Sequence, residues 1–142
     1  MLQMNKQELL TTLVLSEQRI GLVQTLHSFY GANIKVSIGY TNSACNTGID
    51  ELCFSVRSQN ALKRASIFTV GEVINALNQE QIEKIRNLGR KSISEIKTRI
   101  LQFGFDQLSA GEKVQFFSIL IDLNPEKTAE ICASVKGQKR KS

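Results

Sequence analysis

The spacing of hydrophobic side chains predicts a protein built mainly of short α-helices. Asn5 and Glu8 have the spacing of a capping box, in which each side chain accepts a hydrogen bond from the other's backbone N–H. Ser16 precedes a second helical pattern, which runs from Arg19 to Tyr30. We therefore expect two helices in the first thirty residues. The buried face expected for the first helix consists of Leu9, Leu10, Leu13 and Val14.

A two-residue period replaces the helical one over 33–40. Ile34, Val36, Ile38 and Tyr40 alternate with polar or small residues, as in a half-buried strand. Pairing with 52–56 is one arrangement open to this strand. The segment TNSACNTG at 41–48 is rich in turn-forming residues. We therefore place a domain boundary at its end, which makes 1–48 an N-terminal helical extension.

The most regular helical punctuation lies in 49–107, which we expect to be one domain. The expected elements are an extended stretch over 49–56, a helix over 57–66, a helix after Thr69, a short helix after Asn78 and a helix over 90–103. Thr69 and Glu72 form a second capping box. Gly89 is expected to take a left-handed conformation where the short helix ends, and Gly104 to stop the last helix.

Two further helices are expected over 108–136. Ser109 and Glu112 have capping-box spacing, and Asn124 precedes a proline that suits the first position of a helix. Residues 137–142 are expected to be a disordered basic tail. The predicted fold class is mainly α, a compact bundle of short helices with extra N- and C-terminal helices and one short strand pair.

Composition narrows the class of protein. With 42% hydrophobic and 22% charged residues among 142, the sequence fits a globular protein, and it lacks an apolar run long enough for a membrane span. It lacks the basic start of a secretory signal, so we expect a cytoplasmic location. Three scattered cysteines and one histidine, His27, give neither a disulfide framework nor a zinc site. We expect no metal and no cofactor.

The net charge of +5 is unevenly distributed. Residues 49–107 hold nine basic and seven acidic side chains, whereas 136–142 hold four basic side chains and no acid. Such a tail contacts a polyanion loosely or merely solubilises the protein. Charge alone therefore does not identify a nucleic-acid binder.

Motifs for catalysis are not found in the sequence. It has no GxSxG, Walker or HExxH motif, and Glu80 and Glu83 lie among polar residues, as on a solvated helix face. We therefore predict that the protein is not an enzyme.

The turn at Gly89 carries candidate binding chemistry. A glycine lets a phosphate approach the backbone, and a helix that opens with Arg90, Lys91 and Ser92 offers positive charge, a hydroxyl and unpaired N–H groups. This pattern resembles a helix-hairpin-helix and would bind a nucleic-acid backbone rather than read bases. A purely structural turn has the same local sequence.

A second basic element precedes it. Arg57, Asn60, Lys63 and Arg64 fall on one face of the helix predicted over 57–66. Arginine and asparagine at a helix start can enter a narrow groove, where the negative potential is enhanced. The alternative is a solvated charged face.

Together these motifs resemble the C-terminal domain of the bacterial RNA polymerase α subunit. The resemblance covers residues 50–105 and rests on L-x-F-S-V-R-S-x-N-x-L-K, T-V-G-E-V and N-L-G-R-K-S-I-S-E-I-K in that order. It implies a bundle of four short helices that binds the minor groove of A/T-rich DNA and is contacted by transcription activators. The DNA-binding residues implied are Arg57, Asn60, Ala61, Lys63, Gly89, Lys91, Ser92 and Glu95. In this set Arg57 enters the groove, and Glu95 orients Arg57 or another basic neighbour.

The sequence leaves three hypotheses about function. The leading one is a DNA-binding, transcription-associated protein of the bacterial nucleoid, with DNA as its partner and RNA polymerase, a sigma factor or an activator as further partners. The second is a protein-interaction adaptor that docks to those proteins with little DNA binding of its own. The third is a helix-hairpin-helix module of a repair or recombination protein, which the VRSxNxLK segment disfavours. No segment in 1–48 is long enough for the subunit's assembly domain, and the amphipathic flanks would pack on the bundle, form a homodimer or dock a partner.

Overall fold

A computed structural model describes residues 4–31 and 34–141, and its backbone is mainly helical as predicted. Within these residues it forms eight α-helices, two short 3₁₀ helices and no strand. In sequence order they are α1 (Lys6–Ile20), α2 (Leu22–Phe29), α3 (Asn42–Cys45), η1 (Ile49–Leu52), α4 (Val56–Arg64), α5 (Val70–Asn78), η2 (Ile82–Lys84), α6 (Arg90–Asp106), α7 (Ala110–Leu123) and α8 (Pro125–Lys141). None of the described helices is long and apolar enough to span a membrane.

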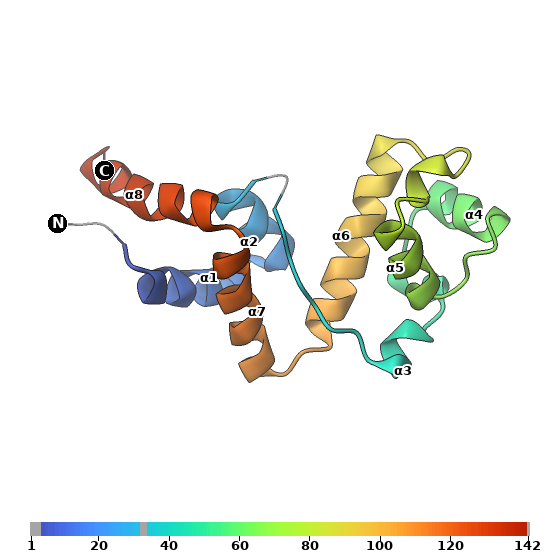
Figure 1. The fold of residues 1–142 in the computed structure, drawn as a ribbon, viewed down its shortest axis with the longest axis horizontal. Helices are drawn as coiled ribbons and strands as arrows, with labels where there is room; N and C mark the ends of the chain where they lie inside the picture. The colour runs from blue at the N-terminus through green and yellow to red at the C-terminus, as the bar shows by residue number, and fades with distance from the viewer. Residues whose placement is uncertain (1–3, 32–33, 142) are drawn as a thin grey trace. The chain divides into compact units, whose positions relative to one another are not determined.

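The protein divides into two compact units, each drawn in Figure 1. The flanking unit combines 1–38 with 108–142, and the central unit comprises 39–107. The predicted boundary after residue 48 is therefore ten residues too late. Thr41 caps α3, whose Ala44 is buried, and a Cβ atom at Gly71 of α5 would lie 3.1 Å from Cβ of Cys45. Turn-rich composition hid a helix that packs closely on α5.

The strand predicted over 33–40 is not formed by the described residues 34–40, and residue 33 lies outside the described residues. Its expected partner, 52–56, is the end of η1 and the start of α4. The side chain of Asn124 takes the place of a neighbouring strand: its Oδ1 accepts from the Lys35 N–H at 2.9 Å, and its Nδ2 donates to the Lys35 carbonyl at 2.8 Å. Alternation predicted the extended backbone but not its partner.

In the flanking unit, α1 packs against α2 and α7, and α7 contacts α8. The capping box of Asn5 and Glu8 is present, whereas Ser16 lies inside α1 and bonds Thr25 through the two hydroxyls at 2.8 Å. The second helix begins instead after Gly21, whose φ of 89° interrupts the first. The backbone of α8 is helical to Lys141 where a disordered tail was predicted, in keeping with the high helix propensity of lysine, arginine and glutamine.

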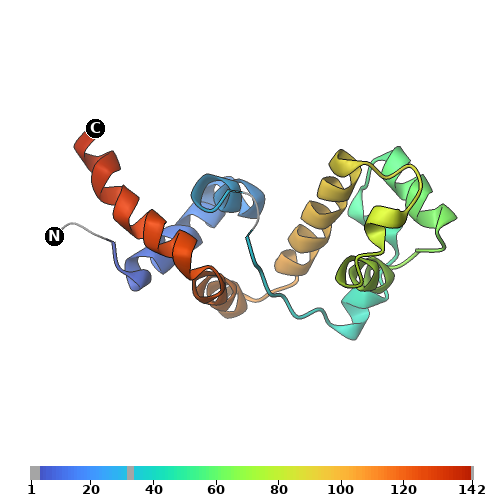
Figure 2. The ribbon, with the colours of Figure 1, turned by 45° about the horizontal axis from the view of Figure 1, so that its top comes forward.

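The central unit has its own hydrophobic core, to which η1 and every helix from α4 to α6 contribute. Its largest fully buried members are Ile49, Leu62, Val70, Ile82 and Ile96. Figures 1 and 2 show α6 running beside α4, and contacts between the two helices agree. The capping box of Thr69 and Glu72 begins α5, as predicted.

Helix α6 continues past Gly104 to Asp106, so this glycine does not end the helix as expected. It admits the ring of Tyr40: a Cβ atom at Gly104 would lie 2.5 Å from Cε2 of that ring. The Tyr40 hydroxyl donates to the carbonyl of Ile100 at 3.0 Å. Burial, with a smaller contribution from Cys45, raises the pKa of Tyr40 to about 12, so the donor proton is retained at neutral pH.

Candidate nucleic-acid interface

The start of α4 is fixed by one carboxylate of α6. Glu95 accepts from the backbone N–H of Ser55 at 2.7 Å, from the Ser55 hydroxyl at 3.0 Å and from the Ser58 hydroxyl at 2.7 Å. Ser55 is the N-cap of α4, and Ser58 is fully buried. Because Arg57 lies between these two serines, Glu95 determines where the arginine leaves the helix.

The hydrogen bonds also act on the carboxylate. Partial burial raises the pKa of Glu95, but the bonds from Ser58 and Ser55, with the nearby Arg99, outweigh that effect and hold it below its usual range. Glu95 is therefore ionised at neutral pH. It acts as an acceptor for the α4 cap.

The start of α6 is open to an approaching ligand. Asn87 takes the left-handed conformation with φ of 72°, and buried Leu88 ties the turn to the core. The prediction for Gly89 is wrong here: its φ is −89°, a conformation open to any residue, and it is the N-cap of α6. The first N–H groups of α6 have no capping bond from the N-cap residue, and a Cβ atom at Gly89 would have nothing within 4 Å.

Arg57 and the start of α6 line one cavity of about 440 Å³, called here the first cavity. Its lining consists of Arg57, Asn87, Leu88, Gly89, Arg90, Lys91 and Ser92. Three of these side chains are cationic and none is acidic. None of the three cations forms an ion pair with another described residue. Uncompensated positive charge beside a helix N-terminus is the arrangement that binds phosphate groups.

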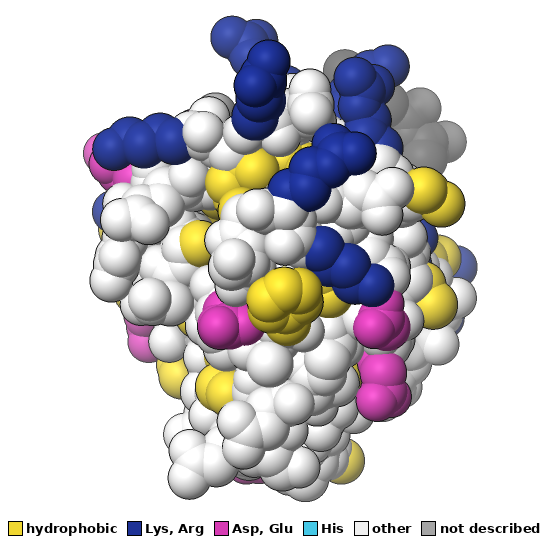
Figure 3. All heavy atoms as spheres, turned by 90° about the vertical axis from the view of Figure 1, so that its right-hand side faces the viewer, with side chains coloured by type: hydrophobic (Ala, Val, Ile, Leu, Met, Phe, Trp, Pro, Cys, Tyr) yellow, Lys and Arg dark blue, Asp and Glu magenta, His cyan; other side chains and the backbone are white. Residues whose placement is uncertain are grey.

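The charge distribution of the surface agrees with this local picture. Figure 3 views the molecule from the end that holds α4 and α5, and basic side chains gather over the upper part of that face. Residues 39–107 have a net charge of only +2. The positive potential at the cavity therefore results from how the charges are placed rather than from an excess of them.

Comparison with known proteins gives a family for this unit. Residues 40–102 match the family described as the C-terminal domain of the alpha subunit polypeptide of bacterial RNA polymerase. Residues 40–102 belong to this family. The limits nearly coincide with those of the central unit at 39–107, so α3 is part of the α C-terminal domain. No solved structure gives a significant match.

Curated relatives show the same similarity. DNA-directed RNA polymerase subunit alpha of Symbiobacterium thermophilum is 46% identical over 63 residues, which are 44% of this sequence and 20% of the relative. The subunits of Syntrophomonas wolfei and Bacillus velezensis are 58% and 52% identical, over 37% and 39% of this sequence and 16% and 18% of those proteins. The sequence therefore matches about a fifth or less of the length of these relatives.

The α C-terminal domain brings together half of the residues predicted for the interface. Arg57, Gly89, Lys91 and Ser92 line the first cavity. Asn60 is exposed on α4, but it is not part of that lining. Sequence reasoning missed Asn87, whose left-handed backbone asparagine tolerates better than most residues. It also left out Leu88 and Arg90 of the quoted N-L-G-R motif.

The remaining predicted residues have other surroundings in the α C-terminal domain. Ala61 is 1% exposed and lines a separate cavity. Lys63 pairs with Asp50 at 3.1 Å, so its charge is partly compensated. Glu95 bonds Ser55 and Ser58 rather than Arg57 itself, so any orientation of the arginine acts through the start of α4. Among the described residues, no three His, Cys, Asp or Glu side chains could hold a metal ion.

Proposed function

We propose that this protein is a DNA-binding, transcription-associated protein whose α C-terminal domain contacts the minor groove and the phosphate backbone. The first cavity carries the proposal, because it joins Arg57 to the uncapped start of α6 without an acidic neighbour. Arg57 would insert into the groove. Gly89, Lys91 and Ser92 would hold phosphates through backbone N–H groups, charge and a hydroxyl.

Preference for A/T-rich DNA follows from the groove contact. A-tracts have a narrow minor groove with an enhanced negative potential, which attracts an inserted arginine. With a net charge of +2, a single α C-terminal domain has little long-range attraction for DNA. Binding by one copy is therefore expected to be weak and sensitive to salt, with a dissociation constant of roughly 10⁻⁴–10⁻⁶ M at physiological salt.

The first experiment removes the groove contact. Fluorescence anisotropy would compare wild type, Arg57→Ala and Lys97→Ala on A/T-rich and G/C-rich duplexes at several salt concentrations. Arg57→Ala should weaken binding to the A/T-rich duplex at least about tenfold, or about 1.4 kcal/mol, and abolish the preference for it. Lys97 is exposed on α6 and lines neither cavity, so its replacement controls for the loss of one charge.

Two results would contradict the proposal. One is the absence of salt-sensitive DNA binding by the folded wild-type protein. The other is equal binding by Arg57→Ala and Lys97→Ala, which would remove the groove contact. Circular dichroism of each variant would show that its helices are intact.

An exposed aromatic side chain supports a second candidate, a docking surface for RNA polymerase, a sigma factor or an activator. Phe68 lies just before α5 with 52% of its surface exposed, although such a side chain in a domain of this size is usually covered. Phe68→Ser should leave DNA affinity unchanged. If Phe68→Ser weakens a pull-down of RNA polymerase from nuclease-treated lysate while Arg57→Ala does not, the adaptor function is favoured.

A further inference from the structure

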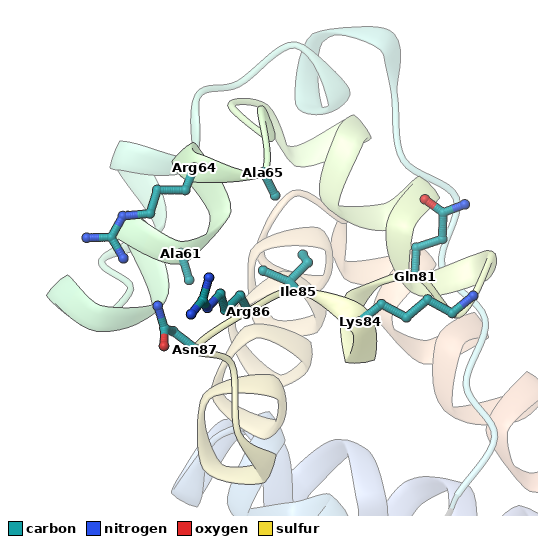
Figure 4. Close-up of a pocket in the computed structure, with 8 residues that line it drawn as sticks. All are labelled: Ala61, Arg64, Ala65, Gln81, Lys84, Ile85, Arg86 and Asn87. Carbon is teal, nitrogen blue, oxygen red and sulfur yellow. The ribbon is translucent and has the colours of Figure 1, made fainter.

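A second basic cavity lies on the central unit, with a volume of about 470 Å³. Figure 4 shows its lining, which comes from the end of α4, from η2 and from the turn that leads to α6. The lining residues are Ala61, Arg64, Ala65, Gln81, Lys84, Ile85, Arg86 and Asn87. Neither the family match nor the motifs at Gly89 and Arg57 assign a role to the three cations in this set.

The chemistry of this second cavity suits an anion. Arg64, Lys84 and Arg86 are exposed, and none of them forms an ion pair with another described residue. No acidic side chain lines the cavity, and Gln81 and Asn87 add amide donors. The two cavities together account for six of the nine basic residues in 39–107 and for none of its seven acidic residues.

The arrangement of the cations selects the kind of anion. In Figure 4 the Arg64 and Lys84 side chains extend away from each other at two ends of the cavity, and Arg86 lies between them. Cations directed at one point would bind a compact anion such as free phosphate. Cations spread along a surface instead match a polymer with a phosphate at every step, as in a nucleic-acid strand.

Asn87 connects this surface to the first cavity, because it lines both. Its left-handed backbone forms the corner at which the backbone turns from η2 into α6. A duplex held at the first cavity would therefore have backbone phosphates next to the second. Continuity between the two linings favours one DNA molecule across both over an unrelated ligand.

We propose that Arg86, with Arg64 and Lys84, binds phosphates of the same duplex beyond the segment held by Arg57 and the start of α6. This inference rests on the proposed function, because it extends the DNA footprint of that interface. These contacts lie on the backbone, so they add affinity at any sequence and leave the A/T preference to Arg57.

The salt dependence of binding by the full-length protein tests this inference. Arg86→Ala should weaken binding to A/T-rich and G/C-rich duplexes by the same factor, about three- to tenfold, and lower the slope of log affinity against log salt by about one. Lys84→Ala should behave in the same way. Arg86→Lys should keep the slope, and Lys97→Ala should match the wild type.

A second measurement locates the contact. Duplexes with a single uncharged methylphosphonate at successive positions would be titrated with wild type and Arg86→Ala. At one or two positions, neutralising the phosphate should weaken the wild type but not Arg86→Ala, since the variant has already lost that contact.

The possible failures are distinguishable. If Arg57→Ala loses DNA binding while Arg86→Ala and Lys84→Ala match Lys97→Ala, the second cavity is not part of the footprint and only this inference is overturned. If every phosphate that matters to the wild type matters equally to Arg86→Ala, the inference is again overturned. Loss of the proposed function itself would appear as a wild-type protein without salt-sensitive binding.

Discussion

At the scale of single residues, Gly89 has no structural need to be glycine. Its φ of −89° is available to any residue, and a Cβ atom there would have nothing within 4 Å. Gly104, in contrast, is required by the ring of Tyr40. If Gly89 is needed at all, the need arises from something that approaches the start of α6 from outside. A phosphate bound to the N–H groups of that helix is such a group.

Gly89→Ala should therefore separate binding from stability. Replacing a glycine in an unstrained conformation stabilises a fold by about 0.4–1 kcal/mol, because the unfolded state loses freedom. The variant should keep or slightly raise its melting temperature while DNA affinity falls about fivefold, on the order of 1 kcal/mol. Thermal unfolding and anisotropy titration would measure the two effects.

Gly111→Ala is the matched control for this variant. Gly111 lies in α7 of the flanking unit, and a Cβ atom there also has nothing within 4 Å. It should gain stability without any loss of DNA affinity. Equal DNA affinity of Gly89→Ala and wild type would show that no ligand comes close to Gly89.

Glu95 couples pH to the stability of the interface. Its pKa is lowered in the folded protein, so the ionised form stabilises the fold above the ordinary pKa of a glutamate, and this contribution is lost as the pH falls through the lowered value. At pH 7, Glu95→Gln should lower the free energy of unfolding by about 1 kcal/mol. Near pH 3 the difference from wild type should shrink.

Urea unfolding at a series of pH values would measure this difference. Glu51→Gln, which removes an exposed carboxylate from η1, controls for a general change in charge. A constant difference between Glu95→Gln and wild type across the range would show that the bonds from Ser55 and Ser58 do not depend on ionisation.

At the scale of elements, the contact between Tyr40 and α6 holds the start of the central unit in place. Gly104→Ala would place a methyl group 2.5 Å from Cε2 of the Tyr40 ring, so the ring or the helix must shift. Overpacking of this kind typically costs about 1–3 kcal/mol, in spite of the higher helix propensity of alanine. The melting temperature of the variant should fall. Gly111→Ala, which also gains helix propensity but meets no neighbour, should show no such loss.

Short-range signals explain which elements the sequence could predict. The capping boxes of Asn5, Thr69 and Ser109 are all present, because each depends on residues three positions apart. The strand over 33–40 depended on a distant partner, and Asn124 took that place. The end of α6 depended on Tyr40, more than sixty residues earlier in the sequence.

The same distinction applies to the site. Arg57 and the residues after Gly89 were found because helix starts, glycines and basic residues are local signals. The bonds from Ser55 and Ser58 to Glu95 span about forty residues, so the sequence indicated a positioning role without its partners. The second cavity joins the end of α4 to the turn before α6, and no local pattern connects Arg64 with Arg86.

At the scale of the whole molecule, contacts divide the protein differently from its order. Residues before 39 and after 107 form one unit, and the residues between them form the other. The central unit has its own core, and its Tyr40, Ser58 and Glu95 bonds all lie within it. No buried side-chain polar atom of the described residues lacks a hydrogen-bond partner. The physical requirements for independent folding are thus met within 39–107.

A fragment spanning 39–107 should therefore unfold cooperatively, and its DNA affinity should lie within about threefold of the full-length protein, since both cavities are retained. Thermal circular dichroism and anisotropy titration would test the two expectations. A folded fragment that loses more than about tenfold in affinity would assign part of the DNA contact to the flanking unit. The basic residues from Lys136 onward would then be the first to replace, because four positive charges without an acid are the largest cationic group outside the central unit.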